Sequence, residues 1–174
     1  MKLLAICGSP RKGNTEFMLR TILDAAKGEK ELILLREKNI NHCQGCLYCD
    51  KHKTECAVKD DMQEMYKKLE EADVIIIGTP NYFDNVPGLM KDFIDRTNPY
   101  YETGKLKGKK LFVLVSGGGE PKNSKRVVNQ ALKYFANCHE LEFVGDYCVQ
   151  ALKIGEADKK EVIAELKKIG ESLG

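Results

Sequence analysis

Four cysteines lie within fourteen residues of this sequence, and their spacing suits a metal centre held by sulfur. Cys43, Cys46 and Cys49 are each separated by two residues, and Cys56 follows after six more. Thiolates ligate the irons of iron–sulfur clusters, and two-residue gaps let one short turn of backbone present three of them while a longer return supplies the fourth. We therefore expect Cys43, Cys46, Cys49 and Cys56 to hold a cluster.

Other uses of these thiols remain open. A bacterial ferredoxin would place the fourth cysteine after a three-residue gap and follow it with proline, whereas here the gap is six and Ala57 follows. Zinc also accepts four thiolates, although structural zinc sites usually consist of two separated cysteine pairs. Redox-active or simply free thiols are a third reading. Disulfides fit least, because seven cysteines is an odd number and no N-terminal segment predicts secretion.

The remaining cysteines do not belong to this pattern. Cys7, Cys138 and Cys148 stand alone in apolar, strand-like surroundings. A free cysteine behaves as a small hydrophobic residue, so we predict that these three contribute to packing.

Composition limits the class of protein. A chain of 174 residues predicts a single domain, 1–174, with a cysteine-rich loop at about 41–59, called here the cysteine loop. The net charge is only +2 and its signs are interleaved, which predicts no nucleic-acid partner. The longest apolar runs fall far short of the roughly 18 residues that a membrane helix requires. We expect a soluble, cytoplasmic protein with no membrane contact.

The order of apolar segments predicts an α/β fold. Buried-type strands alternate with segments in which apolar residues recur at helical spacing. The third strand is almost wholly aliphatic, as in parallel sheets buried on both faces. Five such units predict a doubly wound, five-stranded parallel sheet with the flavodoxin-like order 2-1-3-4-5. The expected strands are 3–7, 31–35, 74–78, 110–116 and 141–148, and the expected helices are 15–26, 62–69, 89–94, 124–137 and 158–173.

Ligands of such sheets bind beyond the carboxyl ends of the strands, so the loops there matter most. The first loop, 8–15, differs from the nucleotide P-loop pattern by one residue, because Asn14 stands where the lysine belongs. No aspartate closes the third strand to organise magnesium, which argues against a triphosphate. The hydroxyls of Ser9 and Thr15, the Arg11 guanidinium and the amides from Gly13 to Thr15 instead predict a cradle for a single phosphate.

Two further loops complete a ligand site. Residues 79–87 offer adjacent aromatic rings and several amide side chains, which suit the flat face and polar edge of an isoalloxazine ring. Residues 116–119 leave backbone amides uncovered, so a ligand can approach closely. One loop suits a phosphate, the second suits the face of a flavin ring and the third suits the edge of that ring. Together the three loops predict FMN. The candidate ring contacts are Pro80, Asn81, Tyr82, Phe83, Asp84, Asn85, Ser116, Gly117, Gly118 and Gly119.

These motifs resemble a known family. The stretches Gly8-Ser9-Pro10-Arg11-x-Gly13-Asn14-Thr15, Thr79-Pro80-x-Tyr82-Phe83 and Lys91-x-Phe93-Ile94-Asp95-Arg96 resemble the NADPH-dependent FMN reductase-like flavoproteins, and the four cysteines make the chain similar to their iron–sulfur flavoprotein branch. The resemblance implies one FMN and one 4Fe-4S cluster per subunit in a homo-oligomer whose subunit contacts help to bring cluster and flavin together. It implies phosphate contacts from Ser9, Arg11, Asn14 and Thr15, and a structural or assembly role for Asp95 and Arg96.

The resulting hypothesis is an electron-transfer oxidoreductase. A one-electron donor, ferredoxin in the first instance, would reduce the cluster, and FMN would deliver two electrons to an acceptor such as dioxygen or hydrogen peroxide. No catalytic side chain is required, and His42, His52 and His139 are interpreted as surface or internally bonded residues. Two alternatives stay open: an NAD(P)H-dependent flavin reductase with incidental thiols, although no G-x-G-x-x-G motif is present, and a zinc-binding structural or regulatory module.

Overall fold

A five-stranded parallel sheet forms the centre of the molecule in a computed structural model that describes residues 1–174. The strand order is β2-β1-β3-β4-β5, which confirms the predicted doubly wound, flavodoxin-like arrangement. The strands are β1 (Lys2–Cys7), β2 (Glu29–Leu34), β3 (Val74–Pro80), β4 (Lys110–Gly117) and β5 (Glu142–Gln150).

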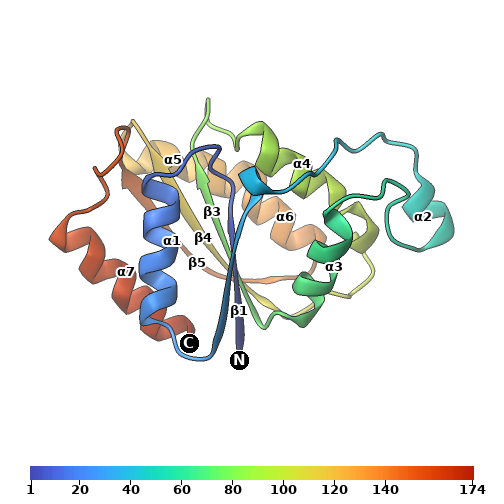
Figure 1. Ribbon diagram of the computed structural model, residues 1–174, viewed down its shortest axis with the longest axis horizontal. Coiled ribbons are helices and arrows are strands. Elements are labelled where there is room, and N and C mark those ends of the chain that lie inside the picture. Colours follow the sequence, from blue (N-terminus) through green and yellow to red (C-terminus); the bar gives the residue numbers. More distant parts are fainter.

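Helices cover both faces of the sheet. In Figure 1, α1 and α7 lie on one side of the strands, whereas α3, α4 and α6 lie on the other. The helices are α1 (Asn14–Ala25), α2 (Tyr48–His52), α3 (Met62–Glu71), α4 (Gly88–Arg96), α5 (Pro121–Val127), α6 (Lys133–Cys138) and α7 (Lys160–Leu173), with short turns η1 (Leu35–Glu37) and η2 (Asn98–Tyr100) and a π-helical turn η3 (Val128–Leu132).

The central strand β3 shows why the sheet is parallel and enclosed. Side chains along a strand alternate between the two faces of its sheet. Ile75 and Ile77 therefore join the core under α3 and α4, while Val74 and Ile76 join the core under α1 and α7. All four are fully buried, and a strand buried on both faces needs the continuous aliphatic run seen in the sequence.

Several elements differ at their ends from the sequence-based expectation. The edge strand β2 begins at Glu29 rather than Glu31, because its ladder with β1 extends over polar residues that face solvent. The helix predicted over 124–137 is a continuous helical stretch that starts at Pro121 and passes through the π-helical turn η3. Strand β5 ends at Gln150, two residues later than expected, where it still pairs with Gly117 of β4.

The cysteine loop is the largest departure from regular structure. It runs between β2 and α3 and contains only the short helix α2, which the sequence did not predict. In Figure 1, α2 stands at the outer end of the molecule, beyond α3 and away from α1 and the sheet. The cysteine loop therefore extends outward from the layers of helices and sheet and is not part of them.

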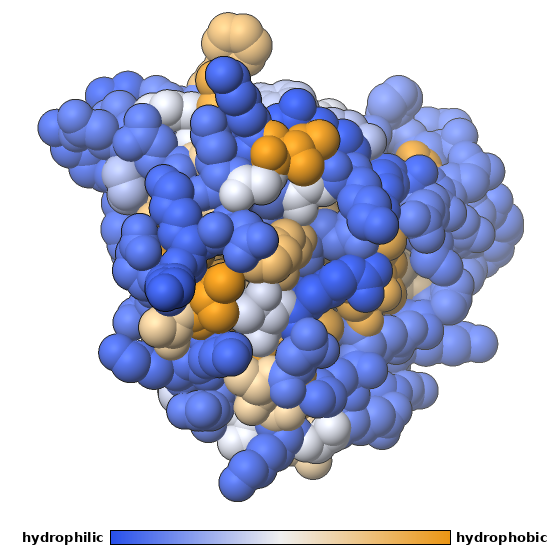
Figure 2. Space-filling model, turned by 60° about the vertical axis from the view of Figure 1, so that its left-hand side comes forward, coloured by the Kyte–Doolittle hydropathy of each residue, from blue (hydrophilic) through white to orange (hydrophobic).

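One face of the molecule is mainly polar. Hydrophilic residues cover most of the face drawn in Figure 2, and apolar residues appear there only in separate patches. No helix combines the length and the apolar character needed to span a membrane.

Candidate cofactor sites

The three loops singled out in the sequence meet at the carboxyl edge of the sheet, beyond β1, β3 and β4. They surround one hollow, called here the strand-end pocket. It is lined by Ser9, Arg11, Asn14, Thr15, Pro80, Asn81, Tyr82, Ser116, Gly117, Gly118, Ala151 and Leu152.

A buried hydroxyl pair joins the first of these loops to the third. Thr15 is the second residue of α1 and Ser116 lies near the end of β4, and their Oγ1 and Oγ atoms are 2.8 Å apart. Both residues are almost completely buried. Because no side chain caps the N-terminus of α1, its first amides remain free for an anion, which the positive end of the helix dipole favours.

Arg11 and Asn14 contact a segment that sequence reasoning missed. Arg11 Nη2 donates to the carbonyl oxygen of Leu152 at 2.7 Å, and Asn14 Nδ2 donates to Lys153 O at 2.8 Å. Asn14 Oδ1 accepts hydrogen bonds from the amides of Gly155 (3.0 Å) and Ala157 (3.3 Å). The Asn14 side chain is therefore occupied with fixing the loop after β5, and any phosphate contact from this residue falls to its backbone amide.

The segment after β5 was detectable in principle. Ala151 and Leu152 follow the carboxyl end of the fifth strand, which reaches the same edge of the sheet as the other three loops. The Ala151 amide donates to Gly117 O at 2.7 Å and so joins this segment to the third loop. These residues could have been found from their position at the end of the fifth strand, but not from their residue types.

The second loop ends in a strained tight turn. Tyr82 and Asn85 exchange two backbone hydrogen bonds, of 2.9 and 3.0 Å. Between them Phe83 and Asp84 have φ angles of 53° and 58°, a left-handed conformation that costs free energy in residues other than glycine. Asn81 Oδ1 accepts the Asp84 amide at 2.8 Å and Arg126 Nη1 donates to Asp84 Oδ2 at 2.7 Å, so the turn is held from both sides.

The turn separates the two predicted aromatic contacts. Tyr82 is half-exposed and lines the strand-end pocket, but the Phe83 side chain is fully exposed and points away from the protein. Four other candidates also lie outside the pocket lining: Gly13, Asp84, Asn85 and Gly119. Phe83, Asp84 and Gly119 border an adjoining hollow that shares Asn81 and Gly118 with the pocket.

The glycines of the third loop explain how a flat ring could be accommodated. A Cβ atom added to Gly117 would lie 3.1 Å from both Asn81 Cβ and Ser124 Oγ, and one added to Gly118 would lie 3.1 Å from Leu152 Cδ1. A side chain at either position would therefore crowd this wall of the pocket. A polar cradle at the start of α1, a bare backbone wall and one aromatic side chain at the rim fit FMN.

The four candidate metal ligands lie in different surroundings. Cys43 and Cys46 are exposed, Cys49 is half-exposed and Cys56 is buried. No three His, Cys, Asp or Glu side chains in the molecule are gathered closely enough to hold a metal ion. The chemistry of these side chains nevertheless fits a thiolate-ligated centre, because one loop carries four free thiols. In addition, Asn98 Nδ2 donates a hydrogen bond to Cys49 Sγ at 3.3 Å. Their assignment as ligands stays a prediction.

Two of the other three cysteines match their expected role. Cys7 and Cys148 lie on strands and are buried, whereas Cys138 is the last residue of helix α6 and is half-buried, so its strand-like assignment was wrong. Burial raises the pKa of the Cys7 thiol, and burial followed by the nearby Asp146 carboxylate raises the pKa of Cys148 to about 11. Neither thiol is a thiolate at neutral pH, so neither is a ready metal ligand or nucleophile.

The histidines also match expectation. His42 is exposed and its Nδ1 lies 2.6 Å from Asp92 Oδ1, a hydrogen bond that raises the pKa of the imidazole. His52 is exposed beside the Tyr48 ring. His139 is buried, with Nε2 at 2.9 Å from Thr97 Oγ1, and burial lowers its pKa. None of them lines the strand-end pocket.

Comparison with known proteins shows the family of this chain. Residues 1–151 match the family described as NADPH-dependent FMN reductase. An iron–sulfur flavoprotein of Archaeoglobus fulgidus is 36% identical over 179 aligned positions, covering 99% of this chain and 80% of that protein. A second one from the same organism is 48% identical over 100 residues, 56% of this chain but only 49% of the relative. One from Methanocaldococcus jannaschii is 35% identical over 150 residues, 84% and 77% of the two chains.

Solved structures share the fold. A flavone reductase superposes with a TM-score of 0.77 at 24% identity, covering 98% of this chain and 60% of the other. An NAD(P)H:quinone oxidoreductase from Methanothermobacter marburgensis gives 0.80 at 16% identity, covering 99% and 96%. The chain belongs to the NADPH-dependent FMN reductase family. Within that family it groups with the iron–sulfur flavoproteins.

Proposed function

We propose that this protein is an electron-transfer oxidoreductase that carries FMN in the strand-end pocket and a 4Fe-4S cluster on Cys43, Cys46, Cys49 and Cys56. A ferredoxin or similar protein is the proposed one-electron donor, and dioxygen or hydrogen peroxide the proposed two-electron acceptor. The cluster would supply one-electron chemistry and FMN the exchange between one and two electrons. The supporting observation is that one chain combines a pocket suited to FMN with four thiols on a single loop.

The protein's own residues would bind and orient these groups. Ser9, Thr15 and the first amides of α1 would hold the FMN phosphate, with Arg11 neutralising its charge. Tyr82 would cover one face of the ring, and the backbone of Gly117 and Gly118 would lie against it. The pocket contains no histidine, aspartate or glutamate, so no side-chain acid or base is assigned to the chemistry.

A homo-oligomer is part of the proposal. The cysteine loop carries α2 at the outer end of the molecule, away from the helix α1 whose N-terminus borders the strand-end pocket (Figure 1). Assembly of subunits would bring the cluster of one copy toward the flavin of another. Because all seven cysteines are free, we place the protein in the reducing cytoplasm.

The direct test is the composition and spectrum of protein purified without oxygen. About four irons, four acid-labile sulfides and one FMN per chain are expected. FMN without iron would leave a flavin reductase, and zinc without flavin would overturn the proposal.

A second candidate function follows from the family description, which names NADPH as the reductant. In that case NAD(P)H would reduce FMN directly, and the cysteine loop would be incidental. Reduced ferredoxin and NADPH should be compared as donors to the purified protein under anaerobic conditions. Bleaching of the flavin by reduced ferredoxin in the wild type but not in a cluster-free variant supports electron transfer through the cluster. Equal bleaching by NADPH in both supports the reductase.

A further inference from the structure

A buried arginine lies at the base of the cysteine loop. Arg96 is the last residue of α4, and its side chain is completely buried although it carries a full positive charge. Replacing a buried ion pair by apolar residues is often neutral or even stabilising, so stability alone is a weak explanation for such a charge. The contacts of Arg96 give a more specific one.

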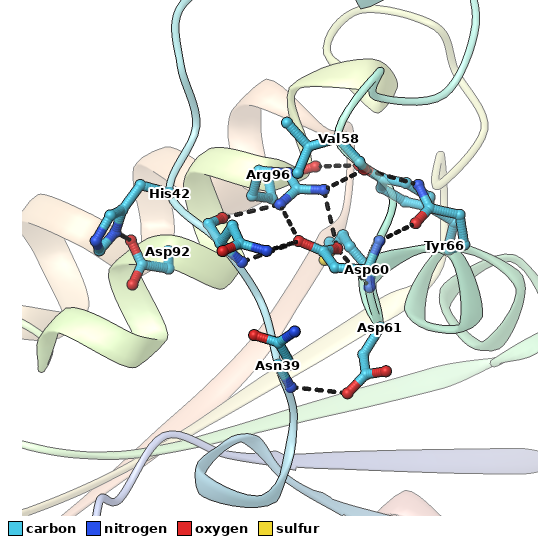
Figure 3. Close-up of polar contacts among 11 residues, drawn as sticks. Asn39, His42, Val58, Asp60, Asp61, Tyr66, Asp92 and Arg96 are labelled. Carbon is cyan, nitrogen blue, oxygen red and sulfur yellow. Dashed lines mark hydrogen bonds and ion pairs between the residues drawn. The ribbon is translucent and has the colours of Figure 1, made fainter.

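The guanidinium bridges both ends of the cysteine loop. Arg96 Nη1 donates to the carbonyl oxygen of Asn41, where the loop begins, at 2.8 Å. Arg96 Nη2 donates to the carbonyl oxygen of Val58, where the loop ends, at 3.0 Å. Figure 3 shows the guanidinium lying between Val58 and Asp60. Asn41 and Val58 flank all four candidate ligand cysteines, so these two bonds close the loop at its base.

Asp60 completes the closure from the other side. Its two carboxylate oxygens accept Nη1 and Nη2 of Arg96 at 2.7 and 3.0 Å, a bidentate pair. Asp60 Oδ2 also accepts the backbone amide of Asn41 at 2.9 Å, and Oδ1 accepts the amide of Met62 at 3.0 Å. Burial by itself would raise the pKa of Asp60, but these hydrogen bonds outweigh it and hold the pKa at about 2. The carboxylate is ionised at neutral pH.

The closed base is anchored to the core of the domain. Tyr66 of α3 is buried, and its hydroxyl donates to the backbone carbonyl of Arg96 at 2.6 Å. Asp61 Oδ2 accepts the amide of Asn39 at 2.7 Å, which adds a second link just outside the loop. None of these contacts involves a cysteine, so the base is closed independently of any metal.

One donor of Arg96 remains free. Its Nε is buried and makes no hydrogen bond, whereas the other nitrogens of the group are engaged. Cys56, the buried member of the four cysteines, belongs to the same core cluster as Tyr66, whose hydroxyl binds the Arg96 backbone. Val58, which accepts a hydrogen bond from Arg96 Nη2, follows Cys56 by two residues. The guanidinium therefore binds the loop next to the cysteine that enters the core.

We propose that Arg96 is the positioning residue of the metal site, closing the cysteine loop at Asn41, Val58 and Asp60 on either side of the four thiols. The proposal rests on the proposed function, since it assigns a role toward the cluster. The closed base would shorten the conformational search of the four thiols. Lysine could keep the charge but could not reach three acceptors on two sides.

The test compares wild type with Arg96→Lys in the anaerobically purified protein. Loss of iron to a chelator should be about tenfold faster or more in the variant, as for other groups that orient metal ligands, while FMN per chain stays unchanged. The double variant Arg96→Gln, Asp60→Asn, which leaves no unpaired buried ion and keeps the net charge of the pair at zero, should release iron faster in the same way. Arg20→Lys, an exposed arginine of α1, is the control and should change none of these.

A readout that needs no cluster separates the two proposals. In wild-type protein stripped of metal, the amides of residues 39–62 should exchange hydrogen more slowly than in stripped Arg96→Lys. The wild type as purified could contain no iron and still show the slower exchange. That result would overturn the proposed function and would leave the closed base standing, without a role toward an iron cluster. Iron-loaded variants that release iron at the wild-type rate, or that lose FMN in parallel, would overturn the inference.

Discussion

The strand-end pocket and the cysteine loop are built in opposite ways. The pocket is assembled from the ends of four strands and the start of α1, and its walls are joined by bonds such as the pair between Thr15 and Ser116. The cysteine loop has no sheet beneath it, and its exposed thiols Cys43 and Cys46 face solvent. Its base is fixed to the rest of the protein at Arg96 and Asp60, and Asp92 and Asn98 add single contacts to His42 and Cys49.

The comparison separates two ways to prepare a cofactor site. In the pocket the fold itself places the polar groups, so a ligand finds them ordered. In the loop the fold supplies the donors and a closed base, and the metal must gather the thiols. Coordination free energy can do this, because metal binding and the ordering of ligands are coupled. Perturbing one region should therefore leave the other intact.

The largest effect is expected from Cys46→Ser. Removing one thiolate should abolish the cluster while FMN remains bound at one per chain, as counted by iron, sulfide and released flavin. Cys138→Ser, which changes a cysteine outside the loop, is the control and should retain iron. Loss of both cofactors from Cys46→Ser would show that the two regions are not independent.

Arg11→Ala tests the pocket alone. We expect FMN affinity to fall by about 2 kcal/mol, roughly 30-fold, because a charge-assisted phosphate contact and the link to Leu152 O are both lost. Titration of the stripped protein with FMN measures this, with iron content unchanged. Lys12→Ala should bind normally. Unchanged affinity in Arg11→Ala would place the phosphate elsewhere.

Asn98→Ala makes a finer change beside the loop. The Asn98 amide donates to Cys49 Sγ, and a hydrogen bond to a ligand sulfur stabilises the more negative, reduced cluster. Its removal should lower the reduction potential by on the order of 40 mV, equivalent to one hydrogen bond of about 1 kcal/mol. A redox titration of the cluster signal measures the shift, and Asn137→Ala is the exposed control. A potential equal to wild type would remove Asn98 from the site.

The smallest effect concerns pH and His139. Burial lowers the folded-state pKa of this imidazole below its ordinary 6.5, so the unfolded chain takes up the proton first as pH falls. The stability that His139 contributes is therefore complete above pH 6.5 and declines as pH falls toward the folded pKa. Thermal unfolding of His139→Gln should depend less on pH between 7.5 and 5.5 than that of wild type. His52→Gln should follow wild type, and equal slopes for all three would contradict the assignment.

Much of the pocket followed from the sequence because its elements obey short-range rules. The aliphatic run 74–77 predicted a strand buried on both faces, and the start of α1 after Gly13 placed Thr15 where a helix leaves its amides free. Asn14 shows the limit. Its residue type fitted a phosphate loop, yet its side chain is used by the segment after β5, more than 130 positions away.

The sequence by itself determined the alternation of strands and helices and the spacing of the cysteines, because periodicity and spacing are properties of neighbouring residues. The strand order was expected from the number of alternating units, for which 2-1-3-4-5 is a common arrangement, and the sheet confirms it. Only the tertiary structure decided that Leu152 completes the strand-end pocket, that Phe83 points into solvent and that Arg96 closes the cysteine loop. Each of these depends on which distant segments meet. The Arg96 guanidinium had no local partner that could reveal it, since its acceptors lie 36 to 55 positions earlier in the chain.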